Sequence, residues 1–365
     1  MDEHPSSLAG GLEGGRELVR VAGSGAPLGG ELMGGSAGGL ERAAGAITRP
    51  AETRFSYALD PEVAGSLAGA SEGPETLSVE VAPDQRFAGF DRDGMARLVG
   101  RVIELDGRWA RCGVPELTGW WQRALWRMAA RRRAVWRVGR RGGKSQTLCK
   151  LAVVCCIHGE HVVPSTDIGT VIVVSYERSD AADRIKTCAE LLKLLGWNRT
   201  DKGLPKMARE YNVTADGITL MREDGAMRRI LVVTCSVRSA RSKTAIALLF
   251  DEVAFWRDDD DVNPASDILA SARPCMAGQP LAFEIMSSTP WSSEDEHGKA
   301  FDEGETDEQT VHEAPTWVAR PTLTEAETHT LEKDIVKWEC EYACIPRPSY
   351  ATSYFDPEAI ERACA

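Results

Sequence analysis

The sequence predicts an α/β fold with a mainly parallel central sheet covered by helices on both faces. Three near-continuous apolar runs, 170–175, 245–250 and 281–288, are typical of strands buried on both faces of such a sheet. An amphipathic helical pattern at 179–196 separates the first run from the second. Polar motifs follow directly after the strands, and parallel sheets bind ligands at the carboxyl ends of their strands. The same edge of the sheet is therefore the expected site.

The first predicted strand leads into a glycine-rich turn and then a helix. "AVWRV" (134–138) reads as a strand, and "GRRGGKS" (139–145) follows it. Residues 144–157 then read as a helix. The expected apolar face of that helix consists of Leu148, Leu151, Ala152 and Cys155.

This strand, turn and helix form a candidate phosphate-binding loop of the Walker A kind. Backbone N–H groups and the helix N-terminus would face an anion, Lys144 would reach its terminal phosphates, and Ser145 would hold Mg²⁺. The strict pattern G-x-x-x-x-G-K-[ST] has Val138 at its first position, so Gly139 supplies the early glycine. A glycine-rich turn with a solvated lysine is the alternative. The candidate nucleotide-binding residues are Gly139, Arg141, Gly142, Gly143, Lys144, Ser145 and Gln146.

Positive charge is concentrated around this turn although the chain is acidic. The formal net charge is −12, yet no Asp or Glu occurs from Leu117 to Gly159. We interpret this basic block as a local anion site rather than a surface that coats nucleic acid. Its ten cations are Arg123, Arg127, Arg131, Arg132, Arg133, Arg137, Arg140, Arg141, Lys144 and Lys150.

The central part of the chain supplies further expected elements. In the helix at 179–196, Ser179 can cap the N-terminus and Gly196 can end the last turn. "GITLMR" and "RRILVVTCS" flank "EDGAM", which predicts a β-hairpin. The ten cysteines and "HGEH" show no metal-ligand spacing, so buried free thiols are expected. No apolar run is long enough to span a membrane, which predicts a soluble cytosolic protein.

Two acidic residues end the strand at 245–250. "IALLFDEVAF" places Asp251 and Glu252 at the tip of a buried strand, where carboxylates are costly without a metal or hydrogen-bond partners. Asp251 would hold the Mg²⁺ shell and Glu252 would polarise the attacking water, as in a Walker B strand. The 107 residues from Lys144 to Asp251 leave room for the intervening elements. Together the two motifs predict a P-loop NTPase fold of the ASCE/RecA-like type.

Hydroxyl groups end the strand at 281–288. "EIMSSTP" brings Ser287, Ser288 and Thr289 to this edge, where Ser288 and Thr289 could bind the γ-phosphate or the lytic water. Hydroxyl groups are also common at strand ends without any function, so this alternative stays open.

With these motifs in order, the sequence resembles the ATPase part of the large terminase subunit, the DNA-packaging motor of tailed phages, over about residues 110–360. In that family the phosphate loop carries an arginine three residues before its last glycine, and Arg140 stands there. The resemblance implies that Arg140 acts in cis on the γ-phosphate, with Arg141 as a substitute. "LTGWWQRALWRM" resembles the adenine-binding element and implies a nucleotide contact for Gln122, although a helix packing its tryptophans inward explains it too.

Four further stretches carry the resemblance. "SVRSARSKTAIALLFDE" resembles the Arg-Ser lead into the acidic strand, and "SSTP" the coupling motif. "LEKDIVKWECEYA" resembles the Glu-Tyr helix that closes the ATPase region, and "TSYFDPEAI" the bridge to a second domain.

The resemblance implies an ATP hydrolase with Glu252, Arg140 and Lys144 as catalytic residues and with ATP and Mg²⁺ as cofactors. It further implies movement of double-stranded DNA without sequence preference, a portal protein and a small terminase subunit as partners, a homo-oligomeric ring, and the cytoplasm of a bacterial host. DNA contacts should be directed at phosphates. Arg131, Arg132 and Arg133 are candidates for these contacts, and a solvated helix face explains them equally well.

The domain organisation departs from the family at both ends. Residues 1–85 are rich in Gly, Ala and Ser and are expected to be largely disordered. Residues 86–345 form the predicted ATPase domain, and 346–365 a linker. Family members continue with an RNase H-like nuclease, which would begin where this sequence ends, so we expect no nuclease activity from the chain. Two alternatives stay open: another P-loop translocase of helicase type, and an inactive nucleotide-binding prophage remnant.

Overall fold

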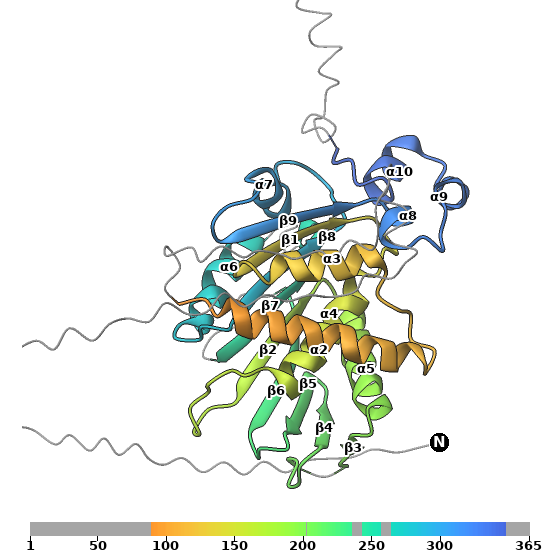
Figure 1. Ribbon diagram of the computed structural model, residues 1–365. Helices are drawn as coiled ribbons and strands as arrows, with labels where there is room; N and C mark the ends of the chain where they lie inside the picture. The colour runs from red at the N-terminus through yellow and green to blue at the C-terminus, as the bar shows by residue number, and fades with distance from the viewer. Residues whose placement is uncertain (1–88, 202, 236–242, 257–263, 348–365) are drawn as a thin grey trace, which may run out of the picture. The chain divides into compact units, whose positions relative to one another are not determined.

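A computed structural model describes residues 89–201, 203–235, 243–256 and 264–347 (Figure 1). The predicted disordered segment 1–85, most of the Arg-Ser lead and the predicted linker from 348 onward lie outside these residues. The domain boundaries therefore stay predictions.

A mixed, mostly parallel sheet forms the centre of the described chain. Its strand order is β3-β4-β5-β6-β2-β7-β8-β1-β9. Strands β6, β2, β7, β8, β1 and β9 run parallel to one another, whereas β5 runs antiparallel to β4 and β6. The strands are β1 (Arg133–Val138), β2 (Gly169–Ser175), β3 (Asn198–Arg199), β4 (Glu210–Thr214), β5 (Gly217–Met221), β6 (Met227–Thr234), β7 (Thr244–Asp251), β8 (Phe283–Ser288) and β9 (Gln309–Ala314).

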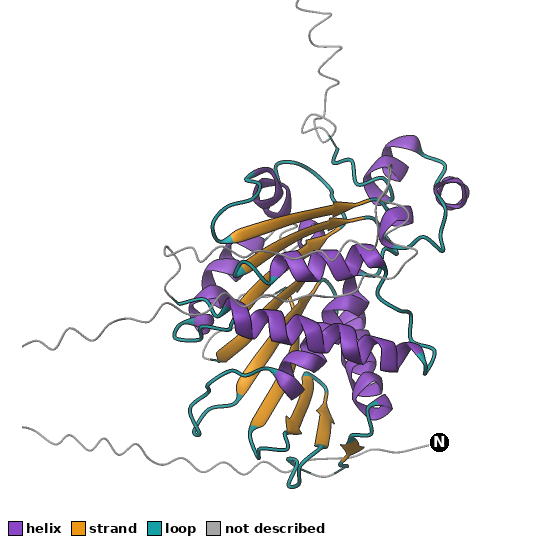
Figure 2. Cartoon of the chain, viewed as in Figure 1, coloured by secondary structure: helices purple, strands orange, loops and turns teal. Residues whose placement is uncertain are grey.

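Helices lie on both faces of this sheet (Figure 2). The long helices are α2 (Arg92–Ala110), α3 (Gly119–Met128), α4 (Lys144–His158) and α5 (Arg178–Leu194). The shorter ones are α6 (Ala265–Ala272), α7 (Glu296–Asp302), α8 (Thr316–Ala319), α9 (Glu325–Leu331) and α10 (Ile335–Glu341), with 3-10 turns at η2 (Val253–Phe255) and η3 (Arg273–Met276). Among the described residues, no helix is both long and apolar enough to cross a membrane.

Two separate hydrophobic cores cover the two faces, which explains the continuous apolar strands. Along β2, Val171 and Val173 join the core beneath α2 to α5, while Ile172 and Val174 join the core beneath α6 and η3. Successive strand side chains point to opposite faces, so a strand such as β2 that is covered on both faces is apolar at consecutive positions. The predicted α/β P-loop fold with a mainly parallel sheet is confirmed.

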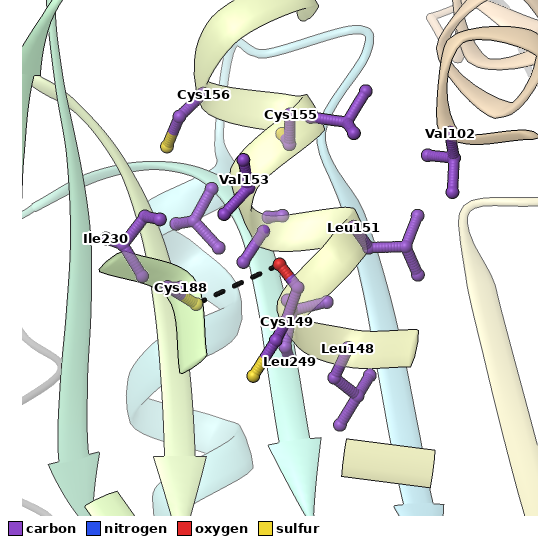
Figure 3. Close-up of a cluster of buried hydrophobic side chains, with 14 of the residues drawn as sticks. Val102, Leu148, Cys149, Leu151, Val153, Cys155, Cys156, Cys188, Ile230 and Leu249 are labelled. Atoms are coloured by element: carbon purple, nitrogen blue, oxygen red, sulfur yellow. Dashed lines mark hydrogen bonds between the residues drawn. The ribbon is translucent and has the colours of Figure 1, made fainter. Parts of the chain in front are cut away.

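Helix α4 is buried along nearly its whole length. All four residues of its predicted apolar face are fully buried, and so are Val153 and Cys156. Figure 3 shows the labelled side chains of α4 packed between α2 and the strands. The Cys188 thiol of α5 lies 3.9 Å from the Cys149 carbonyl oxygen. The helix is thereby fixed by neighbours on several sides, which gives its N-terminal turn a fixed place at the sheet edge.

Most predicted elements are present at or close to their predicted bounds. The strands, the helix at 144–157 and the hairpin, whose strands are β5 and β6, all formed as expected. Gly196 lies just past α5 with a φ of 78°, as a C-terminal glycine should. The capping prediction was wrong: α5 begins one residue earlier, after Glu177, and the Ser179 hydroxyl donates to the Glu177 carboxylate at 3.3 Å.

The basic block does not gather at one site. Lys150 is 1% exposed and pairs with the buried Asp106 of α2, and its ammonium also donates to the Pro115 carbonyl oxygen at 2.6 Å. Arg137 is buried with its guanidinium 3.6 Å from the centre of the Phe301 ring. These two cations therefore hold structural elements together, and the anion-site interpretation applies only to the loop itself.

Candidate nucleotide-binding and catalytic site

The glycine-rich turn folds back on itself between β1 and α4. The Gly142 amide donates to the Gly139 carbonyl oxygen at 3.0 Å. Gly143 has a φ of 94° and Arg141 a φ of 62°, so two residues of the turn adopt the left-handed conformation. Helix α4 then begins at Lys144 with Gly143 as its N-cap. The amides of the first helical turn are thus directed to the carboxyl edge of the sheet, which suits an anion.

Segments distant in sequence clamp the turn in place. The Trp121 indole of α3 donates to the Gly142 carbonyl oxygen at 2.8 Å, and the Thr316 hydroxyl of α8 donates to the Arg140 carbonyl oxygen at 2.8 Å. The Arg140 amide donates to the Glu341 carbonyl oxygen at 2.5 Å. The end of α10 therefore touches the turn directly, which agrees with the resemblance noted for the "LEKDIVKWECEYA" stretch.

We predict that Gly139→Ala destabilises the chain by about 1–3 kcal/mol, because overpacking a tight contact costs that much. A Cβ at this position would lie 2.7 Å from the Tyr342 carbonyl oxygen and 2.8 Å from the Thr316 amide nitrogen, both backbone atoms that cannot move alone. The measurement is urea unfolding. Gly107→Ala is the control: its Cβ meets nothing within 4 Å inside α2, and it should stabilise slightly. Equal effects of the two substitutions would contradict the clamp.

Lys144 is the centre of the site. Its ammonium is buried and donates to the Val138 carbonyl oxygen at 2.8 Å and to the Thr289 hydroxyl at 2.6 Å. It also lies 3.3 Å from Oε1 of Glu252. The structure therefore brings together one residue from each of the three strand-end motifs, after β1, β7 and β8.

Glu252 is held in a strained backbone conformation. Its φ of 55° and ψ of 44° are left-handed, which costs a non-glycine residue about 1–2 kcal/mol. Its Oε2 accepts from the Thr289 amide at 3.1 Å and lies 3.5 Å from the Ser288 hydroxyl. Ser288 in turn accepts from the Ala254 amide at 3.2 Å. Strain of this kind clusters at functional sites, so the geometry favours a chemical role for this carboxylate.

Asp251 is buried beside an arginine that sequence reasoning did not select. The Arg184 guanidinium of α5 donates to Oδ2 of Asp251, with Nε at 3.0 Å, and to the Ser145 hydroxyl, with Nη2 at 2.9 Å. Burial raises the pKa of the Asp251 carboxyl; the Arg184 charge opposes this and the Glu252 charge adds to it. The Arg184 guanidinium therefore links the Asp251 carboxylate to the Ser145 hydroxyl.

The residues present fit a magnesium ion that is also bound by a nucleotide. Oδ1 of Asp251 is buried and has no hydrogen-bond partner among the described residues, and the Ser145 hydroxyl faces the same carboxylate through Arg184. The described part of the chain contains no cluster of three or more metal-binding side chains. Mg²⁺ commonly takes one or two carboxylates, with phosphates and water completing its shell. Ser145 and Asp251 would be its protein contacts.

The remaining predicted residues lie at the rim. Arg140 is exposed, and its guanidinium lies 3.4 Å from the Glu341 carboxylate of α10 rather than beside Lys144. Arg141 is exposed and Gln146 half-buried in the first turn of α4. The Gln122 amide in α3 donates to the carbonyl oxygen of Leu117, which precedes the helix, at 3.2 Å, and the adjacent Trp121 donates to the turn. Their roles toward a nucleotide stay predictions.

The candidate DNA-binding arginines are occupied by local contacts. Arg133 pairs with Glu308 at 2.6 Å, and Arg131 donates to the Thr306 carbonyl oxygen at 3.1 Å. Arg132 lies over the Phe90 ring at 5.7 Å. All three are at the amino end of β1, opposite to the end that carries the turn. None of the three lies on a helix, so the alternative of a solvated helix face is wrong, and a role of these arginines toward DNA stays a prediction.

Phage packaging ATPases are among the solved structures that resemble this chain. The large terminase ATPase domain of Thermus phage P74-26 is 14% identical, with a TM-score of 0.42, covering 59% of this chain and 88% of that one. The large terminase of another thermophilic bacteriophage, in complex with ADP, is 10% identical, with a TM-score of 0.46 and coverages of 69% and 53%. The HK97 bacteriophage large terminase is 14% identical, with a TM-score of 0.46 and coverages of 72% and 50%.

The chain thus spans about half of the two longer terminases. No protein-family model matches the sequence, and no curated protein matches it either. At this level of similarity the sheet order and the geometry of the turn, rather than these matches, define the fold.

Chemically, the arrangement can bind a polyphosphate and activate a water. It combines inward amides, a buried ammonium, a carboxylate in a fixed position and a hydroxyl–carboxylate pair for a divalent cation. These are the groups that phosphoryl transfer to water requires.

Proposed function

We propose that the chain binds ATP with Mg²⁺ and hydrolyses it, as the ATPase motor subunit of a phage or prophage terminase that moves double-stranded DNA into a procapsid. The observation that carries the proposal is the contact of Lys144 with Glu252 and Thr289 at one edge of the sheet. Three motifs that resemble the large terminase family meet there in space. The DNA-packaging role rests on that resemblance of motifs, and the ATPase role rests on the geometry.

In the proposed reaction, Lys144 exchanges its protein partners, the Glu252 carboxylate among them, for phosphate oxygens of ATP. This exchange releases Glu252 from its ion pair, so that Oε1 becomes free to accept a hydrogen bond from the attacking water. Oε2 stays fixed by the Thr289 amide, which orients the carboxylate. Bound Mg²⁺ would neutralise charge on the transferring phosphoryl group.

Arg140 would supply further charge to the γ-phosphate after leaving Glu341. Its exposed side chain is free to turn, and the Glu341 contact at 3.4 Å is a surface pair of little energetic weight. The proposed partners are double-stranded DNA bound without sequence preference, a small terminase subunit, a portal protein and further copies of the chain in a ring in the host cytoplasm.

The experiment measures ATP hydrolysis by the full chain with Mg²⁺, alone, with linear duplex DNA and with single-stranded DNA at equal nucleotide concentration. We expect several-fold stimulation by duplex of any sequence, lost as salt rises because phosphate contacts are ionic. Lys144→Ala, in which ATP hydrolysis should be nearly lost, is the negative control.

Two other results would contradict the proposal in different ways. Equal or greater stimulation by single strands, together with strand separation, would indicate a helicase-type translocase. Nucleotide binding without turnover, even with duplex DNA and a small terminase subunit present, would indicate an inactive remnant.

A further inference from the structure

Arg184 lies where a divalent cation would be needed. Its Nη2 atom is 2.9 Å from the Ser145 hydroxyl oxygen and 2.9 Å from Oδ2 of Asp251. Under the proposed function Mg²⁺ would contact the same Ser145 hydroxyl and the same Asp251 carboxylate, whose other oxygen, Oδ1, has no hydrogen-bond partner among the described residues. One nitrogen of a permanently charged side chain therefore bridges the two protein groups of the candidate metal site.

A metal ion and this guanidinium cannot both be fully bound by this pair of groups. Mg²⁺ binds its ligands at about 2.0–2.1 Å and requires near-octahedral surroundings, and a guanidinium bonded to the Ser145 hydroxyl and to one oxygen of the Asp251 carboxylate occupies the space between the two groups. The two cations also repel each other strongly at such a separation. Asp251 is 1% exposed, so the carboxylate needs one cation or the other to offset its desolvation.

The Arg184 side chain is partly exposed. Its exposed fraction is 18%, against 1% for the Asp251 side chain, so the arginine lies nearer to solvent than the carboxylate with which it pairs. The arginine projects from α5, and the Ser145 and Asp251 groups belong to α4 and β7. A rotation of one long side chain would therefore open the pair without moving the sheet.

We propose that Arg184 is an internal counter-cation of the Ser145–Asp251 pair, which competes with the divalent metal and must leave before a metal–nucleotide complex is fully bound. This inference rests on the proposed function for the identity of the metal site. Arg184 is then a positioning residue. With Arg184 present, nucleotide binding depends less on the metal than it would at a site without this arginine.

The test compares affinities for a fluorescent, non-hydrolysable ATP analogue (mant-AMPPNP) with Mg²⁺ and with EDTA, using the full chain. The quantity of interest is the ratio of the two affinities. In Arg184→Gln we expect the ratio to rise by about tenfold, because removing the charge favours the metal form and weakens binding of the metal-free nucleotide. Arg184→Lys keeps the charge and should stay within about threefold of wild type. Lys186→Gln removes an exposed charge from the same helix and should change nothing.

An unchanged or lower ratio in Arg184→Gln would overturn the proposal, since Arg184 would then merely hold Asp251 in place. Failure of the wild-type chain to bind the analogue in either condition would instead overturn the proposed function. If Arg184→Gln does not fold, the arginine Nε–H signal can be followed by NMR in wild type, identified by its loss in Arg184→Lys. This signal should move when Mg²⁺ and analogue are added together and stay with analogue plus EDTA; a signal indifferent to Mg²⁺ would also overturn the proposal.

Discussion

Glu252→Gln is expected to reduce ATP turnover by about 10²–10⁴-fold, because a glutamine amide cannot accept the proton of the attacking water. Binding of ATP should persist. The glutamine oxygen can still accept from the Thr289 amide, and the left-handed backbone at this position is equally strained with either side chain. Lys144 would lose one of its partners at 3.3 Å but keep the Val138 carbonyl and the Thr289 hydroxyl.

The measurement is steady-state hydrolysis combined with nucleotide binding and thermal unfolding of the same samples. Glu303→Gln, a change of the same kind at an exposed position after α7, is the matched control and should leave all three unchanged. A Glu252→Gln chain that turns over ATP at the wild-type rate would remove this residue from the mechanism. Loss of binding together with turnover would indicate a structural role instead.

The parallel part of the fold could be predicted because burial on both faces leaves a direct mark on the sequence. The apolar runs of β2 and β7 mark strands buried on both faces, and β1, β7 and β8 each end at a polar motif, so the shared edge of these motifs followed from sheet geometry alone. The meeting of Lys144, Glu252 and Thr289 was a consequence of that edge. The sequence separation of 145 between Lys144 and Thr289 did not matter, because parallel neighbours align their carboxyl ends.

Strands at and next to the edges of the sheet show no such apolar run in the sequence. Strand β9 carries Gln309, Thr310 and His312 at buried positions, and these polar side chains are accommodated by contacts such as the Gln309 amide with the Ala300 carbonyl oxygen at 2.7 Å. Strand β4, the neighbour of the other edge strand β3, is half-buried and only five residues long. Neither reads as an apolar run, so both were missed, as was α2.

The contacts made by helices over the site were also beyond the sequence. Arg184 reaches Ser145 across 39 residues and Asp251 across 67, and only the way α5 packs on the sheet decides this. In the sequence, Arg184 is only an arginine on an amphipathic helix that follows a buried strand. Many solvated arginines occupy such a position, so nothing in the sequence distinguishes it. Trp121 was quoted within a motif, but its bond to the phosphate loop depends on how α3 crosses that loop.

Lys144→Ala is expected to weaken ATP binding by at least about tenfold and to lower turnover by about 10²–10³-fold, as loss of one preorganised charge at a transferring phosphoryl group does. The ammonium is buried in a fixed position by two carbonyl groups and a hydroxyl, so no water or neighbouring cation can replace it without rearrangement. Lys144→Arg should not restore activity, because a planar guanidinium cannot fit the space of a compact ammonium.

Calorimetric nucleotide binding and steady-state hydrolysis provide the readouts, and Lys206→Ala, at an exposed lysine before β4, is the matched control. The two catalytic variants should differ in kind. Glu252→Gln should separate binding from chemistry, whereas Lys144→Ala should weaken both, because under the proposed function the lysine, unlike Glu252, would contact the phosphates. Wild-type affinity in Lys144→Ala would mean that the nucleotide lies elsewhere, and the contact between the three strand-end motifs would then be structural.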